Sequence, residues 1–134
     1  MRVTADTNVL LRATIADNPD QARIATDILR EAEVVVIPLV ALCEFVWVAR
    51  RAYHLMAADV GDVIRVWLAS PTVRLDRPAV EAGLAMLEAG GDFADGVIAF
   101  DGRRLGGSVF ASFDRRAVEL IQRNGGETQL LDPG

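Results

Sequence analysis

Short β-branched runs alternate with longer segments of helical periodicity along the whole chain. Of all the features of the sequence, this alternation limits the possible folds the most. The pattern predicts strands at residues 2–5, 34–37, within 70–76, 108–112 and 128–131, and helices at 20–32, 38–52, 57–69, 78–89, 92–105 and 114–123. Strands that alternate with helices form a parallel sheet covered by helices on both faces. We therefore expect an α/β fold with a central parallel sheet of four to five strands, in one domain over residues 1–134.

The composition favours a cytoplasmic globular protein. Half of the 134 residues are hydrophobic, which is enough for a sizeable core. The longest apolar segment, 34–49, is interrupted by Pro38 and Glu44 and is shorter than the roughly 20 residues of a membrane-spanning helix. The first residues lack the basic and apolar regions of a signal peptide. A single cysteine, Cys43, cannot form an internal disulfide, as expected in a reducing compartment.

The charge balance limits how the chain can bind nucleic acid. All 14 basic residues are arginine, a bias that GC-rich codon usage explains without any function. The net charge of -5 argues against a general electrostatic attraction to nucleic acid. Any role in nucleic-acid binding would therefore depend on local groups of arginines or on bound cations.

Glu44 interrupts the apolar stretch "VALCEFVWVA" at residues 40–49. An ionised carboxylate in an apolar environment is costly unless it is paired, neutralised or bound to a metal. The flanking residues leave little polar surface on the predicted helix, so we expect Glu44 to be buried beside a partner. The alternative is an exposed position on one stripe of that helix.

Several other acids lie where ligands bind in parallel sheets. Asp6 follows the first predicted strand, Asp114 follows the fourth, and Glu44 lies about two helical turns after the second. Asp92 and Asp95 begin the helix that leads into the fourth strand. Because ligands bind at the carboxyl ends of parallel strands, we expect Asp6, Glu44, Asp95 and Asp114 to share one crevice.

Each acid also has a purely structural interpretation. Asp6 can form an Asx turn at the end of a strand, Asp92 and Asp95 resemble a helix cap and its third-position partner, and Asp114 can cap the next helix. Four carboxylates in one crevice, in contrast, require cations or raised pKa values. Oxygen ligands favour Mg²⁺ or Mn²⁺ over zinc, and Cys43 and His54 stand alone in the sequence.

Four segments together resemble a known family. They are "VTADTNVLLR", "PLVALCEFVWV", "DFADGVIAF" and "VFASFDRRAVEL". In their order and spacing, over nearly the whole chain, they are similar to the PIN-domain ribonucleases of the VapC-like toxin group. Each segment alone is a weak signal, whereas all four together are specific.

The resemblance implies a set of site residues. Asp6, Glu44, Asp95 and Asp114 correspond to the catalytic acids, with Asp6 and Asp95 as direct metal ligands. Asp92 matches a position that supports a second ion or only caps the helix. The implied supporting residues are Thr7 and Asn8, which orient the first acid, and Ser112, which stands where the family commonly has threonine and keeps the hydroxyl.

The resemblance also implies an activity and partners. One or two Mg²⁺ or Mn²⁺ ions would promote hydrolysis of an RNA phosphodiester, and the protein would be a homodimeric toxin inhibited by a cognate antitoxin. Phosphate contacts would come from four arginines near the site in sequence, Arg103, Arg104, Arg115 and Arg116. The alternative for these arginines is that they are solvated residues at helix ends.

Other functions fit the residues less well. A housekeeping RNA-processing PIN nuclease remains open. A haloacid-dehalogenase-like phosphatase needs an aspartate two residues after the first acid, where this chain has Asn8. A receiver-like domain needs a lysine, and the chain has none. A degenerate nuclease kept for binding would be expected to lack one of the four acids, and none is missing.

Overall fold

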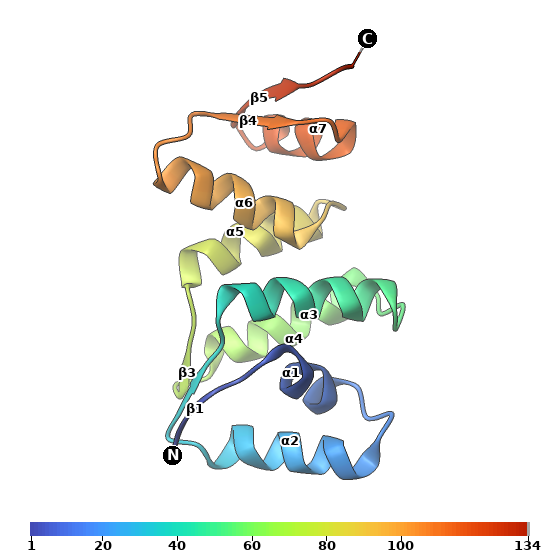
Figure 1. Cartoon of the computed structure of the whole chain (residues 1–134), viewed down its shortest axis with the longest axis vertical. Helices are drawn as coiled ribbons and strands as arrows, with labels where there is room; N and C mark the ends of the chain where they lie inside the picture. Colours follow the sequence, from blue (N-terminus) through green and yellow to red (C-terminus); the bar gives the residue numbers. More distant parts are fainter. Residues whose placement is uncertain (134) are drawn as a thin grey trace. The chain divides into compact units, whose positions relative to one another are not determined.

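The computed structural model describes residues 1–133, which form two compact units. Unit 1 comprises Met1–Arg77 and unit 2 begins at Pro78 (Figure 1). Among residues 1–133, no helix combines the length and the apolar character needed to cross a membrane. The expectation of one domain over the whole chain stays a prediction.

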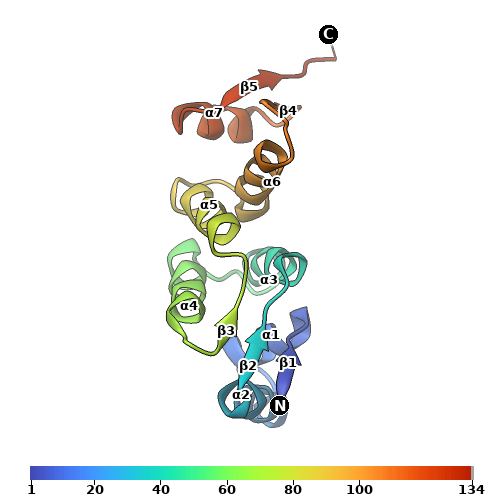
Figure 2. The same ribbon diagram turned by 90° about the vertical axis from the view of Figure 1, so that its left-hand side faces the viewer.

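Unit 1 contains a parallel sheet of three short strands in the order β1-β2-β3, which Figure 2 shows side by side. The strands are β1 (Arg2–Thr4), β2 (Val34–Val36) and β3 (Val73–Arg74). Val35 of the central strand is aligned with Val3 on one side and with Val73 on the other. The uniformly apolar sequence of β2 fits this central position, and Val34 and Val35 are buried.

Four helices complete unit 1: α1 (Thr7–Thr14), α2 (Pro19–Glu31), α3 (Leu39–Arg51) and α4 (Ala57–Ala69). Helix α1 packs against α2 and α3, and α3 also packs against α4. Pro38 is the N-cap residue of α3, so the predicted start of that helix is confirmed. The sequence pattern did not predict α1, which is only eight residues long and buries Leu10 and Leu11. A helix of this length depends on tertiary packing and capping, which periodicity does not reveal.

Unit 2 contains α5 (Arg77–Glu88, from Pro78 on), α6 (Phe93–Arg104), β4 (Val109–Ser112), α7 (Arg115–Arg123) and β5 (Glu127–Leu130). The two strands pair in parallel, from Val109 opposite Glu127 to Ser112 opposite Leu130. Helix α7 lies alongside both strands (Figure 1). Leu120 and Ile121 of α7 pack with Met86 of α5 to form a core cluster, against which Phe110 of β4 also packs.

The prediction of one central sheet of four to five strands is wrong for the described residues. The five strands are present and every strand pair is parallel, but they form a three-stranded sheet and a two-stranded sheet. The α/β class is therefore confirmed, while the single sheet is not. Alternating patterns identify strands, but strand pairing is a tertiary property, and each strand here has only two to four residues to form a ladder.

Two glycines allow α5 and α6 to approach closely. A Cβ atom on Gly83 would lie 2.6 Å from Cε2 of Phe93, and a Cβ atom on Gly96 would clash with the carbonyl oxygen of Ala82. Gly96 directly follows Asp95, so this close packing fixes the first turn of α6, where the candidate acid lies.

We expect Gly96→Ala to lower the free energy of unfolding by about 1–3 kcal/mol because the helical backbone of α5 cannot easily move away. Gly102→Ala, in the same helix, is the matched control. Among the described residues, no heavy atom beyond its chain neighbours and its own helix backbone lies within 4 Å of the added Cβ, so helix propensity should raise stability by up to about 1 kcal/mol. Urea denaturation of both variants checks this, and equal stabilities would contradict it.

Candidate functional site

Asp6 is the N-cap residue of α1, and follows β1 with only Ala5 between them. Its Oδ1 accepts a hydrogen bond from the backbone N–H of Val9 at 3.0 Å. Asp6 and Asn8 are exposed. The end of the first strand therefore places a carboxylate at the surface, held by the backbone of the next helix.

The expectation that Glu44 is buried is wrong, because its side chain is exposed. The apolar residues around it divide between two faces of α3. The buried face consists of Ala41, Leu42, Phe45, Val46 and Ala49, whereas Val40 and Trp47 are exposed like Glu44. The apolar sequence thus extends onto the outer face of the helix, and Glu44 needs no buried partner.

The hydroxyl of Thr7 connects the two acids of unit 1. Thr7 Oγ1 donates a hydrogen bond to Glu44 Oε2 at 2.9 Å. Since Thr7 directly follows Asp6, this bond joins the start of α1 to the middle of α3. The sequence predicted that Thr7 supports the first acid, and the structure shows it bonded to the second one.

In unit 2, two further acids cap helices. Asp92 is the N-cap residue of α6 and accepts a hydrogen bond from the N–H of Ala94 at 3.1 Å. Asp114 is the N-cap residue of α7 and accepts one from the N–H of Ala117 at 3.1 Å. The hydroxyl of Ser112 accepts a hydrogen bond from the N–H of Asp114 at 2.9 Å. The serine therefore helps to hold the turn that presents Asp114.

Asp95 carries the least favourable charge of the group. It lies in the first turn of α6 and is half-buried. Burial raises its pKa above the usual 3.8, and the negative charges of Asp92 and Asp114 raise that pKa further. The carboxylates of Asp92 and Asp114 are therefore close enough to disfavour the ionised form of Asp95.

The donor chemistry of these acids fits a hard divalent cation. Carboxylate oxygens are the ligands that Mg²⁺ and Mn²⁺ prefer, and a cation near Asp95 would offset the repulsion from its two neighbours. Within residues 1–133, neither unit by itself groups three or more histidine, cysteine, aspartate or glutamate side chains tightly enough to form a complete metal site.

The four candidate arginines are exposed and lie at helix ends. Arg103 and Arg104 are in the last turn of α6, and Arg104 pairs with Asp101 at 2.6 Å. Arg115 and Arg116 begin α7. The interpretation as solvated residues near helix carbonyls thus suits the first pair but not the second, which lies at a helix N-terminus.

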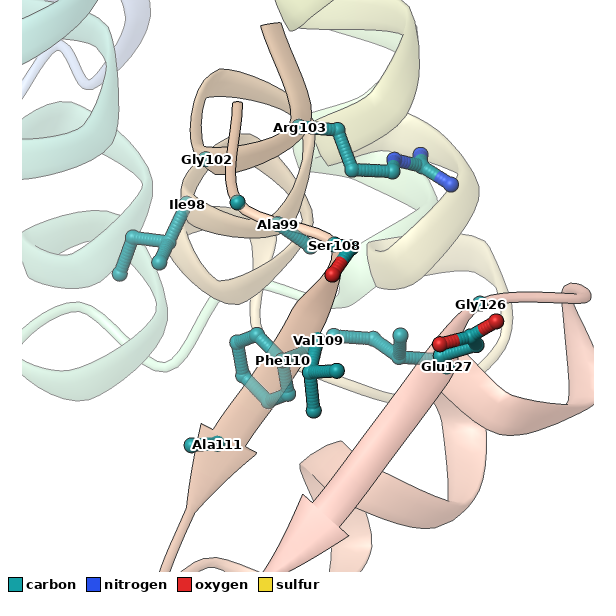
Figure 3. A pocket seen from close by; sticks show the side chains of 12 residues that line it. Ile98, Ala99, Gly102, Arg103, Ser108, Val109, Phe110, Ala111, Gly126 and Glu127 are labelled. Carbon is teal, nitrogen blue, oxygen red and sulfur yellow. The ribbon is translucent and has the colours of Figure 1, made fainter. Parts of the chain in front are cut away.

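Arg103 also lines a pocket of about 320 Å³ in unit 2 (Figure 3). Ile98 and Ala99 of α6 line one part of it, and Phe110 of β4 lines another. None of the five candidate acids borders this pocket. It is therefore distinct from the acidic groups that the sequence singled out.

The parallel strands and the flanking helices define an α/β protein, and carboxylates lie at the starts of three of its helices. The family model described as PIN domain matches residues 3–122, and the chain therefore belongs to the PIN-domain family. PIN domains are generally nucleases and typically use divalent metals. A search of curated proteins found no match.

We expect Thr7→Val to lower the free energy of unfolding by about 0.5–1.5 kcal/mol because it removes the hydroxyl that bonds to Glu44. Thr7→Ser keeps the donor and serves as the control, so it should lose less stability. Urea denaturation of the two variants measures the difference. If both variants lost the same amount, the hydrogen bond would not be the cause.

The raised pKa of Asp95 predicts how stability depends on pH. A carboxyl whose pKa is higher in the folded state stabilises the fold when protonated, and this contribution is lost as pH rises from the unfolded value through the folded one. Asp95→Asn should therefore be more stable than the wild type at pH 7, and the difference should shrink as pH falls towards 3.8.

Thermal denaturation at pH 7 and pH 4 checks this expectation. Asp101→Asn is the control in the same helix, because Asp101 has Arg104 beside it rather than carboxylates, and this variant should gain no stability at pH 7. A wild type as stable as Asp95→Asn at pH 7 would contradict the proposed repulsion.

Proposed function

We propose that the protein is a Mg²⁺- or Mn²⁺-dependent endoribonuclease that hydrolyses RNA phosphodiester bonds. The main support is that the PIN-domain match spans all four acids of the family pattern, Asp6, Glu44, Asp95 and Asp114. The repulsion that raises the pKa of Asp95 supports the same conclusion, because it is the electrostatic condition that a bound cation relieves.

Each acid has a proposed role. Asp6 and Asp95 bind metal directly, Glu44 and Asp114 complete the acidic set, and Asp92 supports a second ion or only caps its helix. A divalent ion held by these carboxylates would supply an acidified water and charge stabilisation at the scissile phosphate. The backbone N–H groups that bond Asp6 and Asp114 hold these carboxylates in place, and the Thr7 hydroxyl orients Glu44.

We also propose that this ribonuclease is the toxin of a VapBC-type toxin–antitoxin pair. The four segments that resemble VapC-like toxins support this narrower assignment. It includes a cognate antitoxin that blocks the acidic residues, and a homodimer of the toxin. A small reading frame next to the gene is expected for a toxin and not for a housekeeping RNA-processing enzyme.

The activity is tested by incubating the purified protein with total bacterial RNA in Mg²⁺ or Mn²⁺ and mapping the cut ends by sequencing. We expect discrete cuts that disappear with EDTA. Asp95→Asn should reduce the cleavage rate by about a hundredfold or more, as expected when one electrostatic contact to the transition state is removed.

Asp101→Asn is the matched control, since it removes a half-buried aspartate of the same helix that pairs with Arg104, and it should cleave like the wild type. Cuts that persist in Asp95→Asn or in EDTA would contradict the proposed site. Asp95→Asn is expected to remain folded, so a thermal melt separates loss of chemistry from loss of structure.

A further inference from the structure

The outer face of α3 carries four exposed residues in one line. Val40, Glu44, Trp47 and Arg51 are spaced by four, three and four residues, which places them on the same side of a helix. Val40 is 70% exposed and Trp47 is 55% exposed. We call these four residues the α3 stripe. It runs from the first turn of the helix, past the proposed catalytic Glu44 in the middle, to the last turn.

The indole of Trp47 is available for contact, unlike the other tryptophan. Trp67 is half-buried and packs edge-to-face against Phe45, with ring centroids 5.1 Å apart. Trp47, in contrast, lines a surface hollow of about 420 Å³ together with Cys43, Glu44 and Val48. The exposed aromatic ring and the proposed catalytic acid therefore border the same hollow.

Arg51 places a positive charge next to this ring. Its guanidinium carbon lies 5.9 Å from the centroid of Trp47, within the range of a cation–π contact. The neighbouring Arg50 has a different contact, a hydrogen bond that its guanidinium donates to the carbonyl oxygen of Leu55 at 2.9 Å. Within residues 1–133 no carboxylate pairs with Arg51, so its N–H groups remain available to bind an anion.

We propose that Trp47 and Arg51 bind an unpaired nucleotide of the RNA substrate, with the base stacked on the indole and its phosphate bound by the guanidinium. This inference rests on the ribonuclease activity proposed above. Aromatic rings stack on any base, and arginine binds phosphate. Bases inside an RNA duplex are not free to stack in this way, so the α3 stripe selects single-stranded segments.

The charges on the α3 stripe favour RNA over a protein partner. The centres of protein interfaces are depleted in charged residues, whereas Trp47 stands between Glu44, three residues before it, and Arg51, four residues after it. In a chain with a net charge of -5, binding of RNA needs local cations of this kind. The aromatic ring and the cation together match a base and a phosphate.

The test measures RNA affinity without cleavage. In Mg²⁺ and in an Asp95→Asn background, a fluorescein-labelled single-stranded RNA of mixed sequence is titrated, and anisotropy reports binding. Trp47→Ala should weaken binding about five- to 150-fold, the range for one stacked base. Trp47→Phe should restore most of the affinity. Arg51→Ala should weaken binding by an amount that shrinks at high salt, as expected for a phosphate contact.

A spectroscopic readout and a matched control isolate the stacking. With Trp67→Phe, Trp47 becomes the sole tryptophan, and its fluorescence should be quenched by single-stranded RNA and not by an abasic strand of the same length. Val66→Ala changes an exposed valine of α4, outside the α3 stripe, without removing a ring or a charge, and should keep full affinity.

The failures of the two proposals can be told apart. If the wild type cleaves RNA in Mg²⁺ while Trp47→Ala keeps full affinity, the stacking is overturned and the ribonuclease stands. If Trp47→Ala keeps its affinity for RNA but turns a dimer into a monomer in light scattering, the stacking is overturned in favour of self-association. If the wild type neither binds nor cleaves RNA, both proposals are overturned.

Discussion

Hydrogen bonds between carboxylates and backbone N–H groups at helix starts are the interaction on which the rest of the acidic arrangement depends. Asp6, Asp92 and Asp114 each accept such a bond at the first turn of a helix. The bond satisfies a donor that the helix leaves unpaired and contributes about 1 kcal/mol. It also occupies one oxygen of a carboxylate that has two. The same residue can therefore stabilise a helix and keep an oxygen for a ligand, so a cap and a metal ligand are compatible roles.

The sequence predicted the elements better than their pairing. The helix over 57–69 has the predicted bounds, and α3 begins directly after Pro38, where a helix start was expected, because proline and apolar periodicity act locally. Helix α1 was missed because its eight residues are held by the Asp6 cap and by the burial of Leu10 and Leu11. The prediction of a single sheet was wrong because the partner of each strand depends on contacts between distant segments, which no local pattern contains.

Glu44 shows that sequence patterns are equally limited in predicting where a site residue lies. The residue was correctly recognised as unusual, but an apolar neighbourhood in sequence does not establish burial, since neighbours in a helix point in different directions. Leu42 and Phe45 face the core, whereas Val40 and Trp47 are exposed. The capping roles of Asp92 and Asp114 were easier to predict, because they follow from the positions of these residues just before helices. The bond from Thr7 to Glu44 was not predictable, because it joins residues 37 positions apart.

Asp95 and Glu44 differ in a way that bears on function. Glu44 is exposed and accepts a hydrogen bond from a hydroxyl, an arrangement that is acceptable without any ligand. Asp95 is half-buried beside two like charges, which raises its pKa and destabilises the ionised form that a metal ligand must adopt. Asparagine at this position would remove the repulsion while keeping the shape. Sequences depart from such local optima mainly where function requires it. The unfavourable charge of Asp95 is therefore the feature of unit 2 on which the proposed cation most depends.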